Sequence, residues 1–201
     1  MKMADKAGLE VLTMRKLGEA LGVEAMSLYN HVANKEGLVD GMIDIVFSEI
    51  ELPGNEPWAL AMRRRATSLR DVLSRHRWAV GLMETRRNPG PANLRHHDAV
   101  LGSLRGAGFS IDAAAHAYSL MDSYIYGFAQ TQMNLPLETP AQIAEVGNEL
   151  LRQFPVDEYP HLAEMIEHAM KPGYNHSSEF EFGLDVVLEG LGRTVRSARS
   201  T

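Results

Sequence analysis

Hydrogen-bonding side chains gather in one short stretch near the start of the chain. Between residues 24 and 35, the exposed side of a predicted helix carries Ser, Tyr, Asn and His instead of the Glu and Lys that usually cover a solvated helix. Short or planar groups of this kind suit phosphate oxygens and base edges. The stretch is therefore a candidate nucleic-acid contact, with an ordinary helical hairpin as the alternative.

The surrounding spacing predicts two short helices joined by a tight turn. Thr13 can cap the first helix, and Leu17 and Leu21 fall on one of its faces. Gly22 can adopt the left-handed backbone of a helix C-terminus. Gly18 costs roughly 1 kcal/mol relative to alanine in mid-helix, which indicates that the second helix crosses closely there. The second helix begins near residue 24, and its apolar side consists of Val23, Leu28 and Val32.

A helical pair with a glycine turn is typical of the DNA-binding helix-turn-helix, whose second helix enters the major groove. The run LTMRKLGEALGVEAMSLYNHVANKEGLVDGM resembles the DNA-binding signature of the tetracycline-repressor (TetR) family, including the LY-x-HV-x-NK segment that closes the recognition helix. In that family a full helix packs across the pair. Here only its last turn, residues 4–7, is expected before Gly8, which would leave the pair short of support.

Two kinds of DNA contact are expected from the helical pair over residues 13–35, which we call the head. Contacts that chiefly involve phosphates are expected from Thr13, Tyr29, His31 and Lys35. Contacts with base edges are expected from Arg15, Ala25, Met26, Ser27 and Asn30, with Arg15 as the best candidate for guanine. Lys35 matches the family's phosphate-contacting lysine, and it opens a predicted helix over residues 34–51 whose N-terminus favours an anion.

Composition limits the class of protein. A chain of 201 residues with 45% hydrophobic content can bury a sizeable core in one or two domains. The absence of cysteine excludes disulfides and thiolate chemistry. The net charge of -6 argues against a non-specific nucleic-acid coat but allows a small reading head on an acidic body. Without a signal region or a long apolar run, we expect a cytoplasmic protein that does not span a membrane.

The rest of the chain reads as helices separated by Pro and Gly, with no alternation that predicts a strand. We therefore expect an all-α protein with a DNA-binding domain over residues 1–51, including the connecting helix, and a helical effector-binding and dimerisation domain over 52–201. The helices of the second domain are predicted over residues 58–76, 78–86, 92–106, 111–133, 141–153, 159–170 and 179–196.

The arginine triplet at positions 63–65 invites a nucleic-acid interpretation. Arginines on an amphipathic helix more commonly lie along its solvated side or pair with carboxylates elsewhere. The second interpretation is favoured.

Small residues recur on two of the predicted helices and allow close helix approach. They either make internal contacts or pair with a second copy in a symmetric dimer, as the corresponding helices of the family do. The candidate interface residues are Ser119, Ser123, Gly127, Gly183, Leu184, Val187 and Leu191.

The segment LRGAGFSIDAAAHAYSLMDSYIYGF resembles the C-terminal domain of the tetracycline-repressor branch, which binds a small molecule among its helices. The resemblance implies a pocket here, although each aromatic residue or methionine could equally be core and the histidine pair a solvated or hydrogen-bonded face. The implied pocket residues are Met83, Asn93, His96, His97, Val100, Tyr118 and Asp122.

No metal or cofactor is expected. Met83 stands where the drug-binding members have a magnesium-ligating histidine, and a thioether is a poor partner for a hard cation. His96 and His97 point about 100° apart on a helix, so they cannot chelate one ion together without ligands from elsewhere. The chain also lacks a phosphate loop, a nucleophile elbow and a Glu-x-x-His pair, so an enzyme is not expected.

The sequence therefore predicts a homodimeric transcriptional repressor that binds a palindromic double-stranded DNA operator and is released by a small-molecule effector. Effector binding would tilt the helix over 34–51 and change the separation of the two heads. The alternative is a dimeric small-molecule or protein-binding module with weak or no DNA binding, because of the short N-terminus.

Overall fold

The computed structural model describes residues 1–134 and 139–198, and over these residues the protein is helical without strands. The expected all-α class is confirmed. The α-helices are α1 (Lys2–Ala7), α2 (Met14–Leu21), α3 (Ala25–Leu28), α4 (Lys35–Ser48), α5 (Trp58–Arg75), α6 (Pro91–Gly106), α7 (Ile111–Asn134), α8 (Pro140–Gln153), α9 (Pro160–Ala169) and α10 (His176–Ala198), and a 3-10 turn, η1, covers Arg77–Ala79.

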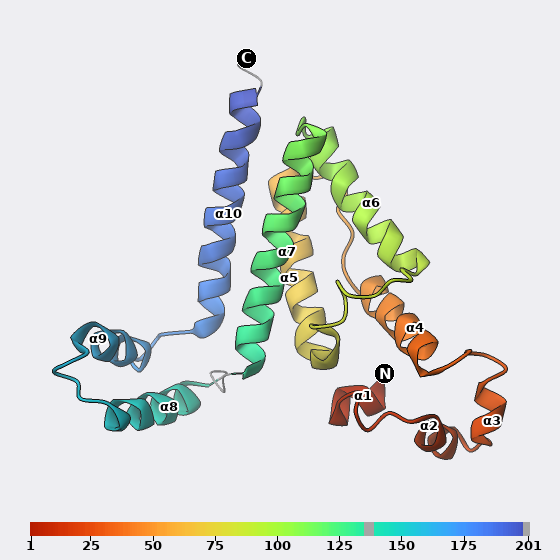
Figure 1. Ribbon diagram of the computed structural model, residues 1–201. Coiled ribbons are helices and arrows are strands. Elements are labelled where there is room, and N and C mark those ends of the chain that lie inside the picture. The colour runs from red at the N-terminus through yellow and green to blue at the C-terminus, as the bar shows by residue number, and fades with distance from the viewer. Residues whose placement is uncertain (135–138, 199–201) are drawn as a thin grey trace.

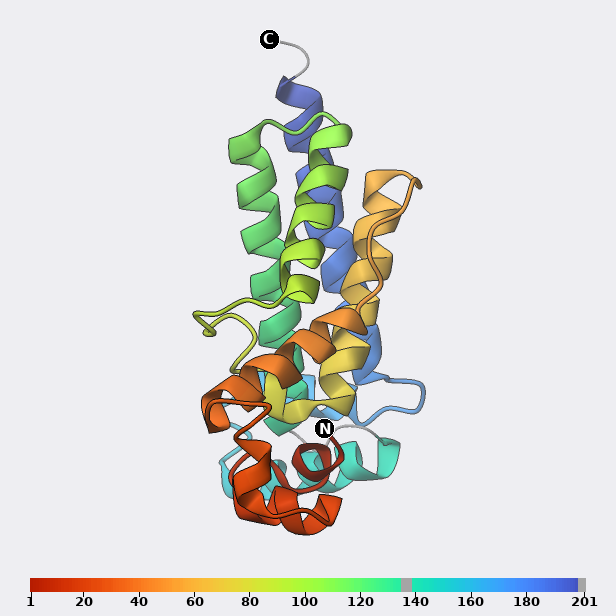
Figure 2. The same ribbon diagram turned by 90° about the vertical axis from the view of Figure 1, so that its right-hand side faces the viewer.

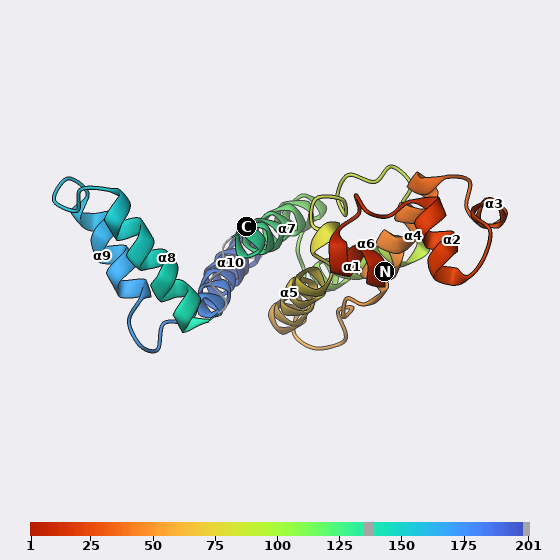
Figure 3. The same ribbon diagram turned by 90° about the horizontal axis from the view of Figure 1, so that it is seen from below.

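The helices form an elongated molecule with a bundle at its centre. Helices α5, α6, α7 and α10 make up the bundle, with α1, α2 and α3 at its lower end (Figures 1 and 2). Seen from below, α2 and α3 lie at one end of the molecule and the α8–α9 hairpin at the other (Figure 3). Helix α4 packs on α6 and so connects the N-terminal helices to the bundle.

One continuous core holds the bundle together. It contains fully buried Phe47 from α4, Leu69 from α5, Leu104 from α6, Met121 from α7 and Leu184 from α10. Burying such large side chains contributes about 1.5–3 kcal/mol each relative to exposure. The four-helix body is therefore the stable part that positions the other elements.

The N-terminal helices have their own small core. Ala4, Leu12 and Met42 are buried together, with Leu9 and Trp78 packed around them. Helix α1 begins at Lys2 and spans six residues, so the expectation of a single turn over residues 4–7 was too short. This helix supplies part of the support for the helical pair, because Ala4 is buried against Leu12 and Met42.

Two predicted helices are shorter than expected. Helix α3 ends at Leu28, because the next three N–H groups bond to carbonyls three residues back, which tightens the backbone into turns. The predicted helix over 78–86 is wrong in the same way. After η1, the N–H groups of Leu82 and Thr85 also bond three residues back.

The predicted apolar faces of the head are only partly buried. Leu21 is 60% exposed and Val23 is 45% exposed, whereas Leu28 is buried. The short α3 offers too little surface to cover both residues. Leu21 and Val23, which the spacing placed on the apolar sides of the two helices, are therefore largely exposed, and only Leu28 of the three is buried.

Candidate DNA interface and effector site

The backbone of the head follows from Thr13, Gly18 and Gly22. The Thr13 side chain accepts a hydrogen bond from the Lys16 N–H (3.2 Å), and Gly22 ends α2 in the left-handed region with φ 70°. A Cβ added to Gly18 would lie 2.8 Å from the Val23 carbonyl oxygen and 3.1 Å from the Ala25 nitrogen. The predicted cap, turn and close helix crossing are confirmed.

The residues predicted to face base edges lie on α2, on α3 and, for Asn30, in the turn after α3. Helices α2 and α3 lie at the end of the molecule opposite the α8–α9 hairpin (Figure 3). Met26 is 74% exposed, Arg15 and Asn30 are exposed, and Ala25 and Ser27 are half-buried. Arg15 Nε donates to Glu19 (3.0 Å) in a fully solvated ion pair. Exposed pairs of this kind contribute only about 0–1 kcal/mol, so Arg15 can exchange Glu19 for another acceptor at little cost.

The residues predicted to contact phosphates lie at the edges of the same surface. Thr13, Tyr29 and His31 are exposed. Lys35 begins α4, where Asn34 caps the helix by accepting from the Gly37 N–H (2.8 Å), as expected. Its Nζ donates to the Leu9 carbonyl (3.2 Å), so it also ties α4 to the segment after α1.

Helix α4 is fixed to the body by carboxylates along its length. Arg86 donates to Asp40 (2.5 Å) and to Glu36 (2.8 Å). One oxygen of Asp44 accepts from the first N–H groups of α6, at Ala92 and Asn93 (2.9 Å each). A movement of α6 or of the Arg86 segment must therefore move α4.

A second junction joins α1, α4 and the end of α5 through His76. Its Nδ1 lies 2.7 Å from Asp5, and its Nε2 lies 3.2 Å from Glu49. Trp78 Nε1 donates to Asp5 (2.7 Å). Burial raises the pKa of Asp5, but hydrogen bonds from His76 and Trp78 outweigh it and hold that pKa below 3.8. Hydrogen bonding from Arg75 chiefly lowers the pKa of Glu49.

The body contains a buried polar centre around Arg65. This arginine is 1% exposed, and its Nη2 lies 2.6 Å from Asp122 on α7. Its Nε donates to His96 Nε2 on α6 (3.2 Å), and its guanidinium lies over the Tyr118 ring at 5.6 Å. Burial, with Arg65 and His97 nearby, lowers the pKa of His96 to about 3. Burial raises the pKa of Tyr118 well above its usual range.

Several predicted pocket residues surround this centre. His97 packs against Tyr118 with ring centroids 5.1 Å apart, and its Nδ1 lies 2.9 Å from the Asn93 carbonyl. Met83 is buried, with its sulfur 3.9 Å from the Tyr126 hydroxyl. Val100 is fully buried in the apolar core. The structure thus brings His96, His97, Tyr118 and Asp122 together around an arginine that the pocket prediction omitted.

All three arginines of the triplet pair with carboxylates. Arg63 pairs with Glu181 and Asp185, and Arg64 pairs with Glu51 and Glu56. Pairing was the favoured interpretation, but a solvated position is wrong for Arg65. The sequence contains a sign that Arg65 is buried, because its helical spacing places it on one apolar face of α5. The residues of that face are Met62, Arg65, Ala66, Leu69, Val72 and Leu73.

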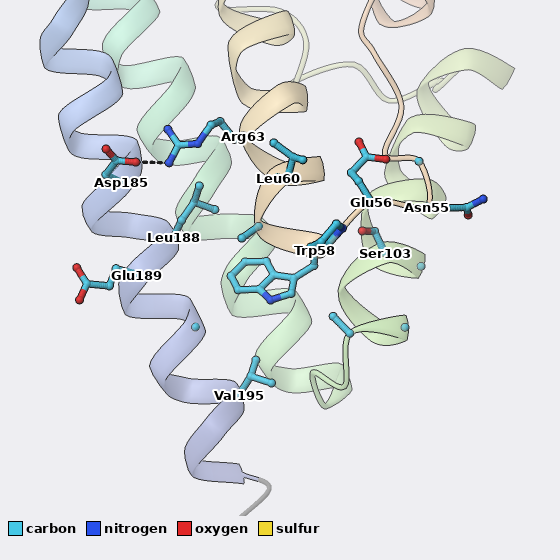
Figure 4. Close-up of a pocket in the computed structure, with 17 residues that line it drawn as sticks. Asn55, Glu56, Trp58, Leu60, Arg63, Ser103, Asp185, Leu188, Glu189 and Val195 are labelled. Carbon is cyan, nitrogen blue, oxygen red and sulfur yellow. Dashed lines mark hydrogen bonds and ion pairs between the residues drawn. The ribbon is translucent and has the colours of Figure 1, made fainter.

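A separate open groove of about 1210 Å³ runs between the start of α5, the end of α6 and α10. Trp58, Leu188 and Val195 line it, and the Arg63–Asp185 ion pair lies at one side (Figure 4). None of the predicted pocket residues lines this groove.

The predicted dimer residues divide into two groups. Ser119, Ser123 and Gly127 are exposed on α7. Leu184 and Leu191 are buried within the chain, and a Cβ at Gly183 would overlap the Tyr124 ring. Leu184 and Leu191 were therefore wrongly assigned, because the α10 face that they occupy packs on α5 and α7. Among the α10 residues whose burial is described, the large apolar side chains that are exposed are Phe182 (69%) and Val186 (56%).

None of the described helices is long and apolar enough to cross a bilayer.

Comparison with known proteins places the chain in a family. Residues 52–195 match the family model described as tetracyclin repressor-like, C-terminal domain. The HTH-type transcriptional repressor DrrR1 of Streptomyces coeruleorubidus is 31% identical over 98% of this chain and 76% of its own length. The class A tetracycline repressor from transposon 1721 of Escherichia coli is 28% identical, over 95% of this chain and 86% of its own.

A solved structure agrees with these matches. The Streptomyces coelicolor TetR family protein ActR, in complex with actinorhodin, superposes with a TM-score of 0.76 at 28% identity, covering 96% of this chain and 93% of that one. These relatives are regulators, and none is named as an enzyme. The chain belongs to the TetR family of transcriptional regulators.

Proposed function

We propose that the protein is a repressor that binds a palindromic operator as a homodimer and is released when a small molecule binds its body. Residues 1–51 form the DNA-binding unit, and residues 52–201 form the effector-binding and dimerisation unit. The observation that carries the proposal is the exposed α2–α3 surface joined, through carboxylates on α4, to the helix that also carries His96. The names of the relatives agree, since they are repressors and one holds actinorhodin.

The route from effector to DNA follows the same contacts. A ligand that shifts α6 pulls on Asp44, and a shift of the segment after η1 pulls on Asp40 through Arg86. Either movement tilts α4 and changes the separation of the two heads. Coupling of this kind typically amounts to about 1–3 kcal/mol, enough to lower operator affinity 5- to 150-fold.

Salt-dependent gel retardation with the gene's own upstream DNA tests DNA binding. Lys35→Ala removes a phosphate contact, so it should weaken binding to all duplexes and lower the salt slope by about one unit. Arg15→Ala removes a base contact, so it should relax the preference at one base pair and leave random DNA unaffected. If neither the wild-type protein nor these variants distinguishes the upstream DNA from random DNA, the repressor proposal is wrong.

Sedimentation tests the dimer. Ser119, Ser123 and Gly127 on α7, with Phe182, Val186 and Val187 on α10, are the proposed contacts. Val186→Glu puts a charge into an apolar face and should yield monomers. Leu94→Glu is the matched control, because Leu94 is equally exposed (57%) but lies on α6. If Val186→Glu and Leu94→Glu have the same oligomeric state in sedimentation, this face of α10 is not the dimer interface.

A further inference from the structure

The His76 ring lies between two carboxylates that belong to different helices. Its Nδ1 lies 2.7 Å from Asp5 on α1, and its Nε2 lies 3.2 Å from both oxygens of Glu49, the residue that ends α4. His76 itself ends α5, and α1 lies just beneath that end of the bundle (Figures 1 and 2). These three residues, with Arg75 and Trp78, form the His76 junction. One side chain of the body therefore holds two N-terminal helices at once.

These contacts set a requirement on the protons of the ring. Hydrogen bonding from Arg75 chiefly lowers the pKa of Glu49. Burial raises the pKa of Asp5, but hydrogen bonds from His76 and Trp78 outweigh it and keep that pKa below its ordinary value. Both side chains are therefore carboxylates at neutral pH, which can only accept. A neutral imidazole has one N–H and one lone pair, so both contacts are hydrogen bonds only when each ring nitrogen carries a proton.

Loss of one proton turns one attraction into a repulsion. The ring is 7% exposed, and the bare nitrogen then points a lone pair at an oxygen of either Asp5 or Glu49. Two further charged groups meet the carboxylates, namely the N-terminal amine, which lies near Asp5, and Arg75, which donates to Glu49 (2.9 Å). Since Trp78 also donates to Asp5 (2.7 Å), each carboxylate keeps a donor. His76 therefore releases one helix without dispersing the junction.

The position of α1 reaches the head through a small core. Trp78 packs against the buried group of Ala4, Leu12 and Met42, and Leu12 directly precedes Thr13, the cap of α2. Release of α1 from the junction therefore loosens the support of α2. Release of the end of α4 instead loosens the helix that connects the head to the body.

We propose that the His76 junction is a proton-sensitive clamp between the N-terminal helices and the bundle. With both ring protons present, it holds α1 and the end of α4 against α5, and loss of one proton as pH rises frees one of them. Histidine changes its charge between about pH 5 and 8, which suits a ring in this position to sense pH. The clamp does not require DNA binding; only its effect on operator affinity rests on the proposed function.

Nuclear magnetic resonance of the full-length protein tests the clamp. The nitrogen shifts of the His76 ring should show a proton on both nitrogens at pH 6 and on one nitrogen at pH 8.5. Over the same range, amide protection factors, which are corrected for intrinsic exchange, should fall at least about tenfold in α1 or at the end of α4, as the loss of a hydrogen bond to a charged group predicts. Protection in α7 should not change. A ring whose proton count stays constant, or equal falls in α1, α4 and α7, would overturn the proposal.

Two variants distinguish a clamp from a merely structural contact. The amide of His76→Gln cannot donate to Asp5 and Glu49 at once, so low protection should persist at every pH. Glu49→Gln should keep the clamp closed at pH 8.5, because its amide donates to the neutral ring while its oxygen still accepts from Arg75. At that pH, α1 should be better protected in Glu49→Gln than in the wild type, and no better protected in His76→Gln.

The matched control is His116→Gln, which removes an exposed histidine of α7. It should keep the wild-type change in protection between pH 6 and 8.5. If that change survives in His76→Gln, or if Glu49→Gln responds to pH as the wild type does, the proposal is wrong.

Gel retardation with the upstream DNA at pH 6 and pH 8.5 separates the clamp from the proposed function. If the protein is a repressor, operator affinity should fall several-fold more in the wild type than in Glu49→Gln, since the exposed His31 is common to both. Equal falls would overturn the link between clamp and operator. A protein that shows the His76 transition but binds no operator keeps the clamp and loses the repressor role. A protein that binds its operator while the ring protons never change remains a repressor without a clamp.

Discussion

The polar residues on α2 and in the turn after α3 differ from those around Arg65 in their access to solvent. Arg15, Asn30 and His31 are exposed to solvent, and Arg15 has only a solvent-exposed ion pair with Glu19, so a substitution there changes DNA affinity more than folding. Arg65 and Asp122 have lost their water and depend on each other. A substitution in that centre therefore changes folding and recognition together.

The largest expected effect is in the buried centre. Asp122→Ala leaves Arg65 as an unpaired buried charge, which should lower the free energy of unfolding by about 3–5 kcal/mol. Arg15→Ala in the head should change it by less than about 0.5 kcal/mol. Urea denaturation followed by circular dichroism measures both. The Arg65→Met, Asp122→Leu double variant should recover most of the loss; a double variant as unstable as Asp122→Ala would show that the ion pair is not the cause.

The next effect depends on pH and separates the same two regions. The pKa of His96 is about 3 in the folded protein against 6.5 ordinarily, so between these values the unfolded chain binds a proton that the folded protein refuses. Stability from this group is complete above pH 6.5 and is lost as pH falls, by up to about 1.4 kcal/mol per pH unit.

Denaturation at several pH values between 6.5 and 4.5 checks this slope. His96→Gln should flatten it, whereas His31→Gln, exposed in the head, should leave it unchanged. Glu49, whose pKa is ordinarily 4.5, contributes equally to the wild type and the variant at the lower end of this range, so the difference between their slopes belongs to His96. A slope that survives in His96→Gln would mean that His96 is charged in the folded protein.

The two regions also differ in how far the sequence predicts them. The sequence correctly predicted the two helix caps, the glycine turn and the close helix crossing, because such features are set by residues a few positions apart. The residues concerned are Thr13, Gly18, Gly22 and Asn34. The class of fold follows from helical periodicity in the same way.

Contacts between distant elements account for the errors. Arg65 is buried because Asp122, on another helix, neutralises it, and no local spacing reveals that partner. The sequence alone favoured a helix over residues 78–86. The structure has an irregular segment there, and Arg86 at its end pairs with Asp40 of α4. Leu184 was assigned to a dimer interface because a helical sequence does not say which apolar face meets its own chain.

A glycine pair tests the helix crossing in the head. Gly18→Ala forces α2 and α3 apart, since its Cβ would meet the Val23 carbonyl at 2.8 Å. It should cost about 1–3 kcal/mol of stability and weaken binding to all DNA. Gly41→Ala is the matched control, because Gly41 lies in α4 with nothing within 4 Å of an added Cβ. It should stabilise the protein by about 0.5–1 kcal/mol. Thermal melts and gel retardation measure both, and a Gly18→Ala protein with normal DNA binding would contradict the close crossing.

The smallest expected effect concerns the junction between the two regions. Asp5 holds α1 against His76 and Trp78, and its pKa is depressed, so its contribution is present above about pH 4 and disappears as pH falls through the folded-state value. Asp5→Asn should lower the free energy of unfolding by about 1 kcal/mol at pH 7. The difference from wild type should shrink below pH 4. Because α1 covers the core that Leu12 and Met42 share, the same variant should exchange the amide hydrogens of α2 faster and leave those of α7 unchanged. Faster exchange in α7 as well would mean that the head and the body unfold as one unit.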